Sequence, residues 1–237
     1  GITGTDVSKE AADMVLTDDN FASIVRAIEQ GRGVYDNIRK FLALLLSGNI
    51  GEVMIIFIAL LIGLPLPLIA IQILLINLVT DGLPATALSA DPFEPGAMKR
   101  KPKKSTSQLY QNLYPYLVVY PTLMIIVVLS LFTWFLRNDS LIKAQTVAFL
   151  CVGLFELYQA FSCRSIIYPV FKVGLFKNKW LNLAVLSSLI VLFAVVFVPF
   201  FQSIFKTVSL SLFELLIVIV LSSVGAMYLE IYKFFKS

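Results

Sequence analysis

The chain has 237 residues, of which 58% are hydrophobic and only 14% are charged, and its mean hydropathy is +0.86. Soluble domains are about 45–50% apolar and about 25% charged, so this composition argues against a soluble domain and points to a lipid bilayer. There is no histidine, which excludes the usual imidazole metal ligand, and the two cysteines lie twelve residues apart in one apolar block, too far for a disulfide on a helix.

The first 24 residues are polar and differ from everything that follows. They combine a helical pattern over 7–14, a strand-like stretch at 14–16 and a turn at 18–20, so we expect 1–24 to be the C-terminal edge of a soluble domain. The start, GITGTD, has neither Met nor a basic-then-apolar signal. We therefore expect a fragment whose N-terminal part is missing.

A helix is expected to run from Phe21 through a stalk at 25–40 and into the first apolar block. Its first part is amphipathic and its later part is wholly apolar. An unbroken helix of this kind would link the soluble domain mechanically to the membrane. A flexible joint at Gly31 and Gly33 is the alternative, and the sequence leaves both open.

Six apolar blocks lie within 41–237, and most approach the ~20 residues that span a hydrocarbon core. We therefore predict an all-α membrane protein with six transmembrane helices. The fourth block is the shortest and most polar, so we expect its neighbours to shield it. The blocks cover about 41–63, 68–88, 113–136, 146–163, 181–201 and 210–229.

The basic residues are distributed unevenly between the two sides of these blocks. Of the 19 Lys and Arg residues, only Arg137, Lys143 and Lys206 fall in the loops on the side away from the termini. The positive-inside rule therefore places both termini in the cytoplasm. The run KRKPKK at 99–104 fits a cytoplasmic loop, so the expected partner is the lipid bilayer and no nucleic acid.

Oxygen-bearing side chains interrupt three of the apolar blocks near their middle. In the first, LLLSGNIGEV (44–53), an amide and a carboxylate stand three residues apart and share a helix face. The second, INLVTDGLP (76–84), carries three polar residues at i, i+3 and i+4, and the fourth carries one acid. The six candidate ligands are Asn49, Glu52, Asn77, Thr80, Asp81 and Glu156.

These side chains predict a cation site. A carboxylate near the bilayer centre costs about 2.5–3.5 kcal/mol on insertion scales, and these blocks hold no Lys, Arg or His to offset three of them. A bound cation supplies the counter-charge, and an all-oxygen set suits Ca²⁺ rather than a soft metal. Gly82 and Pro84 are expected to free backbone carbonyls beside Asp81, and Gly48 and Gly51 to admit a neighbouring backbone.

Each polar residue also has an ordinary interpretation. Asn49 alone fits an interhelical hydrogen bond, Thr80 a bond to its own helix, and a single carboxyl a protonated member of a packing network; Gln159 and Ser162 are taken as packing or supporting residues. A six-helix cation channel or secondary transporter, and a scaffold with protonated carboxyls, therefore stay open as alternatives.

The two polar motifs resemble the fifth and sixth transmembrane helices of P-type calcium-transporting ATPases. Residues 3–41, from TGTDVSKEAADMVLTDDN to the end of the stalk, resemble the end of their phosphorylation domain and the stalk beneath it. The resemblance implies one calcium site at Asn49, Glu52, Thr80, Asp81 and Glu156. A second would use Asn77 and Asp81 with a glutamate from a helix absent here.

The resemblance also sharpens the subtype. Acids at Glu52 and Glu156 match the two-site pattern of the sarcoplasmic and endoplasmic reticulum pumps, whereas secretory-pathway relatives, which also accept Mn²⁺, lack the first acid. Na⁺- and K⁺-transporting relatives place an acid where Asn77 stands. The stretch MKRKPKK at 98–104 departs from the family pattern.

The implied function is that of the membrane part of an ATP-driven pump, which exports Ca²⁺ from the cytoplasm with proton counter-transport. Pumps for Mn²⁺, Na⁺ or K⁺ are the alternatives. The phosphorylated Asp, the nucleotide, actuator and phosphorylation domains with their Mg²⁺ and ATP, and the first four helices would belong to the missing N-terminal half. The chain alone is expected to be inactive, with no catalytic residue. In the whole pump the stalk is expected to tilt Asn49 and Glu52 out of register with Asp81.

Overall fold

The computed structural model describes residues 1–94, 96–100, 109 and 113–236, and within these ranges it contains helices and no strand. Lys101, Lys103 and Lys104 of the basic run lie outside the described residues. Six helical segments are long and apolar enough to cross a membrane, which confirms the predicted fold class. They are 21–61, 70–89, 115–138, 141–162, 179–197 and 212–236.

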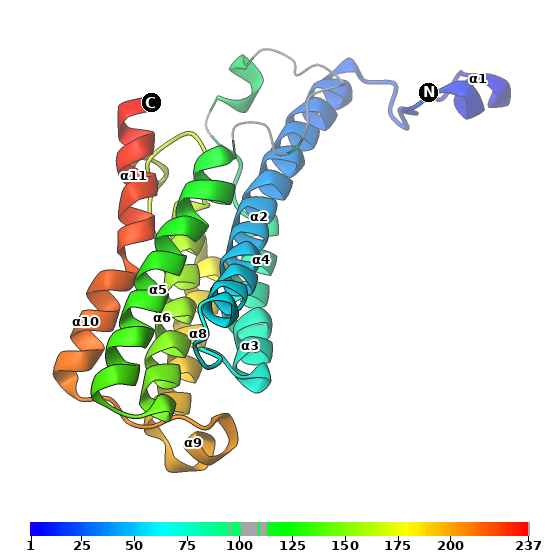
Figure 1. Cartoon of the computed structure of the whole chain (residues 1–237). Coiled ribbons are helices and arrows are strands. Elements are labelled where there is room, and N and C mark those ends of the chain that lie inside the picture. Colours follow the sequence, from blue (N-terminus) through cyan, green and yellow to red (C-terminus); the bar gives the residue numbers. More distant parts are fainter. Residues whose placement is uncertain (95, 101–108, 110–112, 237) are drawn as a thin grey trace.

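These segments pack into one bundle, and both ends of the chain lie at the same end of it (Figure 1). We call this the stalk end, because the first half of α2 projects from it. The elements in chain order are α1 (Asp6–Ala11), α2 (Phe21–Leu61), α3 (Ala70–Leu75), the π-helical turn η1 (Ile76–Asp81), α4 (Gly82–Ser89), the 3₁₀ turn η2 (Ala97–Lys99), the π-helical turn η3 (Pro115–Val119), α5 (Tyr120–Asn138), α6 (Leu141–Ser162), α7 (Val170–Val173), α8 (Lys179–Phe197), α9 (Pro199–Phe205), α10 (Leu212–Ser222) and α11 (Val224–Lys236).

Side-chain caps fix where several helices begin. The side chain of Asn20 accepts a hydrogen bond from the backbone N–H of Ala22, so α2 starts at Phe21. Ser140 and Asn178 cap α6 and α8 in the same way. The cap at Ser140 explains why α6 begins five residues before the predicted block, at Leu141.

α2 runs without a break for 41 residues, from the stalk into the bundle. Gly31 has open space around it, whereas a Cβ on Gly33 would lie 2.1 Å from the ring of Phe93. Gly33 therefore serves close packing of Phe93 against the stalk, and the structure has a continuous helix at both glycines. This observation favours the mechanical link over the flexible joint.

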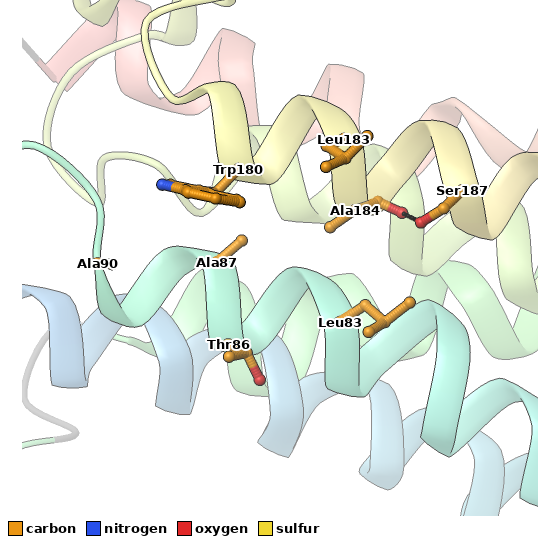
Figure 2. A pocket seen from close by; sticks show the side chains of 8 residues that line it. All are labelled: Leu83, Thr86, Ala87, Ala90, Trp180, Leu183, Ala184 and Ser187. Atoms are coloured by element: carbon orange, nitrogen blue, oxygen red, sulfur yellow. Dashed lines mark hydrogen bonds between the residues drawn. The ribbon is translucent and has the colours of Figure 1, made fainter.

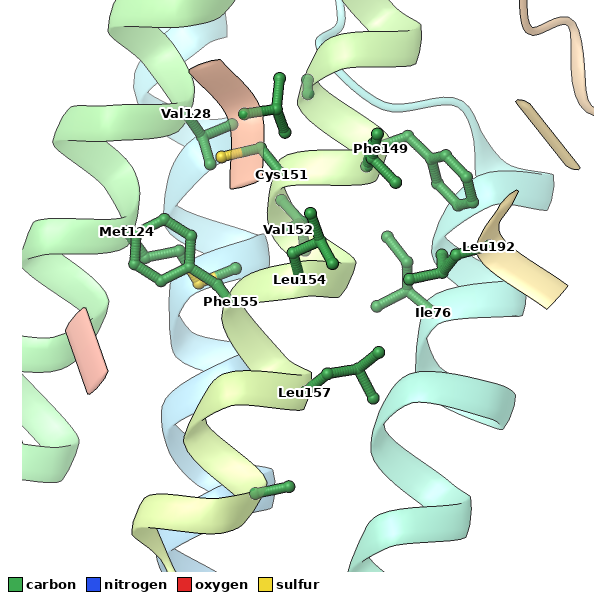
Figure 3. Close-up of a cluster of buried hydrophobic side chains, with 14 of the residues drawn as sticks. Ile76, Met124, Val128, Phe149, Cys151, Val152, Leu154, Phe155, Leu157 and Leu192 are labelled. Atoms are coloured by element: carbon green, nitrogen blue, oxygen red, sulfur yellow. The ribbon is translucent and has the colours of Figure 1, made fainter. Parts of the chain in front are cut away.

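α6 lies at the centre of the bundle. In its most apolar stretch 78% of residues are buried, against 22–44% in the other five spans, which confirms that its neighbours shield it. Figure 3 shows its side chains Cys151 and Phe155 in a buried cluster with Met124 of α5 and Leu192 of α8. Such a core can hold polar residues of α6 away from lipid.

Three details differ from the sequence predictions. Residues 14–16 form no strand, because a strand needs a partner to pair with and the described residues offer none. The fifth span ends at Phe197 rather than 201, since Pro199 opens the separate helix α9 at the end of the bundle opposite the stalk (Figure 1). The sixth span continues to Lys236, with an interruption at Ser223 between α10 and α11.

An apolar groove runs along the outer surface between α4 and α8. Figure 2 shows Trp180 over Ala87 at one end of it, with Leu83 and Leu183 further along. In this groove the Ser187 hydroxyl donates to the carbonyl of Ala184 on its own helix. The groove's lining contains none of the candidate ligands.

Candidate cation site

The second span carries three of the candidate ligands on a widened turn. Residues 76–81 form a π-helical turn, in which the N–H of Gly82 reaches back five residues to the carbonyl of Asn77. A Cβ on Gly82 would lie 3.2 Å from that carbonyl oxygen, so glycine relieves crowding there. Pro84 has no N–H to offer the carbonyl of Thr80. The predicted interruption of the helix thus takes the form of a π turn.

Two amides join the first span to the second. The Asn77 side-chain amide donates to Glu52 Oε2 at 2.9 Å, and the Asn49 amide approaches Asp81 Oδ2 at 3.4 Å. Each asparagine also donates to a carbonyl four residues before it on its own helix. The pairs therefore cross between α2 and η1, and each carboxylate accepts from an amide of the facing helix.

Thr80 connects η1 to α6. Its hydroxyl lies 2.6 Å from Glu156 Oε2 and 2.9 Å from the carbonyl of Ile76. A hydroxyl has one hydrogen to donate, so the two acceptors share it. Thr80 therefore both bonds to its own helix and holds the carboxyl of the fourth span.

Gly48 marks the point where two carboxyls converge. A Cβ placed on Gly48 would lie 3.3 Å from both carboxylate oxygens of Asp81 and from Glu156 Oε1. A Cβ on Gly51 would instead lie 2.7 Å from Met124 Sδ. Both glycines admit side chains of other helices, and not a neighbouring backbone as the sequence suggested.

The three acids are buried and incompletely partnered. Glu52, Asp81 and Glu156 are at most 3% exposed. One carboxylate oxygen of each, Oε1, Oδ1 and Oε1 respectively, has no hydrogen-bond partner among the described residues. A buried oxygen without a partner is costly, so each acid keeps a coordination position that the described protein groups leave open.

The six predicted ligands are not gathered around a single point in space. Asp81 and Glu156 meet at Gly48, whereas Glu52 lies with Asn77. Among the described residues, no group of three or more His, Cys, Asp or Glu is gathered tightly enough to hold a metal ion. The Asn49 and Asn77 amides turn N–H toward the carboxylates, so a half-turn of the amide is needed to present the carbonyl oxygen instead.

Sequence reasoning missed one residue that supports the site. Ser188 of α8 is fully buried, and its hydroxyl donates at 2.7 Å to the carbonyl of Val79 inside the π turn. Gln159, which the sequence suggested as a packing or supporting residue, donates to the hydroxyl of Ser47, the residue directly before Gly48. Nothing in the local pattern around Ser188 distinguishes it from an ordinary serine in a membrane helix, so only the fold reveals its contact.

Comparisons with known proteins show the family to which the chain belongs. The family model for the C-terminus of cation-transporting ATPases matches residues 65–235. A calcium-transporting ATPase of Bacillus subtilis is 44% identical over 227 residues, which cover 94% of this chain and 25% of that protein. Human calcium-transporting ATPase type 2C member 1 is 38% identical over 236 residues, which cover 98% of this chain and 26% of that protein.

Calcium-transporting ATPase 1 of Bacillus cereus is 39% identical over 253 residues, covering all of this chain and 28% of that protein. The chain spans about a quarter of the length of the curated relatives it matches. It is a multi-pass membrane protein by its helices and by these matches. The chain belongs to the cation-transporting ATPase family and corresponds to the C-terminal membrane region of its members.

Proposed function

We propose that this chain is the C-terminal membrane part of an ATP-driven pump that exports Ca²⁺ from the cytoplasm. The observation that carries the proposal is the set of three buried carboxyls, each with one unpartnered oxygen, on three different helices. Hard divalent cations take six to eight oxygens, often from carboxylates and amide carbonyls. The names of these relatives, calcium-transporting ATPases, support Ca²⁺ as the transported ion.

The ligand set we propose keeps the six residues of the sequence prediction, and five of them form two groups. Asp81, Glu156 and Thr80 form one group around Gly48, and Glu52 with Asn77 forms the other. Asn49 lies beside the first group: its side chain is exposed, and its amide approaches Asp81 Oδ2 at 3.4 Å. A glutamate from a helix of the N-terminal half would complete the second group, in the two-site pattern.

The rest of the pump is proposed on the same basis. Residues 1–24 would be the edge of the phosphorylation domain and 25–40 the stalk, both on the cytoplasmic side with the C-terminus. The actuator, nucleotide and phosphorylation domains, with ATP and Mg²⁺, and four further helices would come from the N-terminal half. The chain spans only about a quarter of its relatives, which supports the need for those parts.

Proton counter-transport follows from charge balance. When a divalent cation leaves, the carboxylates of Glu52, Asp81 and Glu156 stand in hydrocarbon without a counter-charge, because no Lys, Arg or His in the described residues is hydrogen-bonded or ion-paired to them. Protonation removes that charge at lower cost than leaving it bare. Protons should therefore leave sealed vesicles as Ca²⁺ enters, which a trapped pH indicator measures.

The direct test uses the full-length pump that contains this chain, reconstituted in sealed vesicles. ATP should drive uptake of radioactive calcium, and Glu52→Gln should reduce it strongly. Glu29→Gln, in an exposed acid of the stalk, serves as the matched control and should transport normally. Uptake that is unchanged in Glu52→Gln contradicts the proposed site.

The same vesicles separate the alternatives. Uptake of Mn²⁺, Na⁺ or K⁺ in place of Ca²⁺ would identify a pump for another cation. Flux without ATP, down a gradient, would identify a channel or secondary transporter. No flux of any ion, with normal folding of all variants, would leave the carboxyls as packing groups.

A further inference from the structure

A second buried polar cluster lies at the stalk end, outside the candidate cation site. We call it the Asp91 cluster, and none of its members is more than 3% exposed. Its members come from four segments: the stalk, the residues just after α4, the residues just after α6 and the N-cap of α8. The members are Asn37, Lys40, Asp91, Arg164 and Asn178.

Asp91 is the centre of this cluster. Its Oδ2 lies 2.9 Å from Lys40 Nζ, and its Oδ1 lies 3.2 Å from Arg164 Nε. Asn178 donates to Oδ1 at 2.7 Å, and Asn37 donates to the Asp91 backbone carbonyl at 2.8 Å. Both carboxylate oxygens and the carbonyl of Asp91 therefore have partners from three other segments.

The charges of the cluster decide which of its members can be replaced. One carboxylate faces two buried cations, so the set carries a net charge of +1. Removing Asp91 would leave both cations without an anion. Removing the charge of Lys40 instead would leave a balanced pair, Asp91 with Arg164. Lys40 is thus the member that can be changed while the bundle keeps its charge balance.

Lys40 and Asp91 lie at similar distances along the chain from the candidate ligands of their own segments. Lys40 precedes Asn49 by nine residues on α2, and Asp91 follows Asp81 by ten, so each is about 14 Å from its ligand along the helix axis. Two further contacts extend the attachment outward along the stalk. The ring of Phe93 lies on Gly33, and Arg100 pairs with Asp36.

We propose that the Asp91 cluster joins the stalk and α4 into one moving unit, so that Lys40 and Asp91 are positioning residues for the cation site. Stalk motion then reaches Asp81 through Asp91, and the ligands on α2 and η1 move together. Separation of α2 from α4 at this level would strip a buried carboxylate from its cation, which is costly. This differs from the expectation that the stalk tilts Asn49 and Glu52 away from Asp81.

The test measures a distance in the full-length protein by pulsed electron paramagnetic resonance. Spin labels go on Ile38 and Ala90, both of which are exposed. The distance should stay the same with calcium and with a calcium chelator. A change of about one helical turn (about 5 Å) between the two conditions overturns the proposal.

Variants of Lys40 test the role of the ion pair. Lys40→Met should broaden the distance distribution and lower the calcium transported per ATP several-fold, while equilibrium calcium binding stays within a factor of about two. Lys40→Arg should restore both values, and Lys143→Met, in an ion pair at the opposite end, should change neither. An unchanged ratio of calcium to ATP in Lys40→Met also overturns the proposal.

Two further arms keep the result interpretable. If Lys40→Met does not fold, Asn37→Ala removes the stalk's bonds to the carbonyls of Ser89 and Asp91 without changing charge, and the same outcomes apply. The expected amount of calcium transported per ATP rests on the proposed function, whereas the expected distance between the spin labels does not. A fixed distance in a protein that transports no calcium rejects the proposed function and keeps the joined unit.

Discussion

The candidate cation site and the Asp91 cluster are two buried sets of charged and polar groups with opposite balance. Within the part of the chain that the structure describes, the site has three acids with no cation paired with them, and each acid keeps an unpartnered oxygen. The cluster has one acid and two cations, and every oxygen of its carboxylate is bonded. Both sets include residues of α2 and of the segment from η1 to just beyond the end of α4.

The difference separates structural charge from functional charge. A buried charge whose partners all come from the protein is stable only as a complete set, and it holds segments together. A buried charge with an open position is a cost to the fold, so something outside the described residues must repay it. The comparison therefore assigns assembly to Asp91 and ligand binding to Glu52, Asp81 and Glu156.

Asp91→Asn should have the largest effect on stability. It leaves Lys40 and Arg164 buried without an anion, so we expect a loss of about 3–5 kcal/mol in the free energy of unfolding. Thermal unfolding of the purified full-length protein measures it. Lys40→Met is the matched control and should lose much less, since Asp91 and Arg164 remain paired. Equal stability of Asp91→Asn and the native protein would contradict the structural role.

Glu156→Gln should have the opposite profile. Removing a ligand charge is expected to weaken calcium binding by about 100-fold or more, because even indirect supports of a metal site change affinity by about 10–100-fold. Stability without calcium should stay equal or rise, since a neutral amide replaces a buried acid that must take up a proton to lose its charge. Equilibrium calcium binding checks this, with Glu214→Gln at the opposite end of the bundle as control. Binding within threefold of the native value would remove Glu156 from the site.

Gly48→Ala probes the point where two of the acids converge. Its Cβ would lie 3.3 Å from oxygens of Asp81 and Glu156, so these must shift by a few tenths of an ångström. We expect roughly tenfold weaker calcium binding, about 1.4 kcal/mol, with a stability that gains from the better helix former. Gly51→Ala, which meets the flexible Met124, should change binding less. If Gly51→Ala weakens calcium binding more than Gly48→Ala does, the ion does not lie beside Gly48.

Ser188→Ala should have the smallest effect. It removes one hydrogen bond to the Val79 carbonyl in the π turn, worth about 0.5–1.5 kcal/mol. If the turn positions Thr80 and Asp81, calcium affinity should fall a few-fold, and Ser188→Thr should restore it. Ser187→Ala is the neighbouring control, because the Ser187 hydroxyl donates to the carbonyl of Ala184 on its own helix. Equal affinities in Ser188→Ala and the native protein would make the bond purely structural.

Much of the fold follows from the sequence because a bilayer imposes long apolar helices. The six spans, their approximate limits and the shielding of the fourth are all predictable from hydropathy and from the polar residues of α6. The cap at Ser140 and the proline at position 199 shift two limits by about four or five residues. Capping and proline act on single positions that a broad apolar pattern does not resolve.

The site is less predictable than the fold. Helical spacing places Asn49 with Glu52, and Asn77 with Asp81, on shared faces, but it does not fix which helix faces which. The contacts Asn77 with Glu52 and Thr80 with Glu156 depend on how three helices pack. The Asp91 cluster is beyond sequence reasoning, because its residues come from four separate segments and each is an ordinary charged or amide residue near a helix end.

The most direct test of the contrast is the thermal stability of the full-length protein with and without calcium, compared between the native protein and Asp81→Asn. A ligand that binds only the folded state raises its stability by an amount that grows with the logarithm of the ligand concentration divided by the dissociation constant. The account predicts that calcium raises the unfolding temperature of the native protein, and that Asp81→Asn is at least as stable without calcium but gains nothing from it. A calcium-dependent rise of the same size in Asp81→Asn would contradict the account.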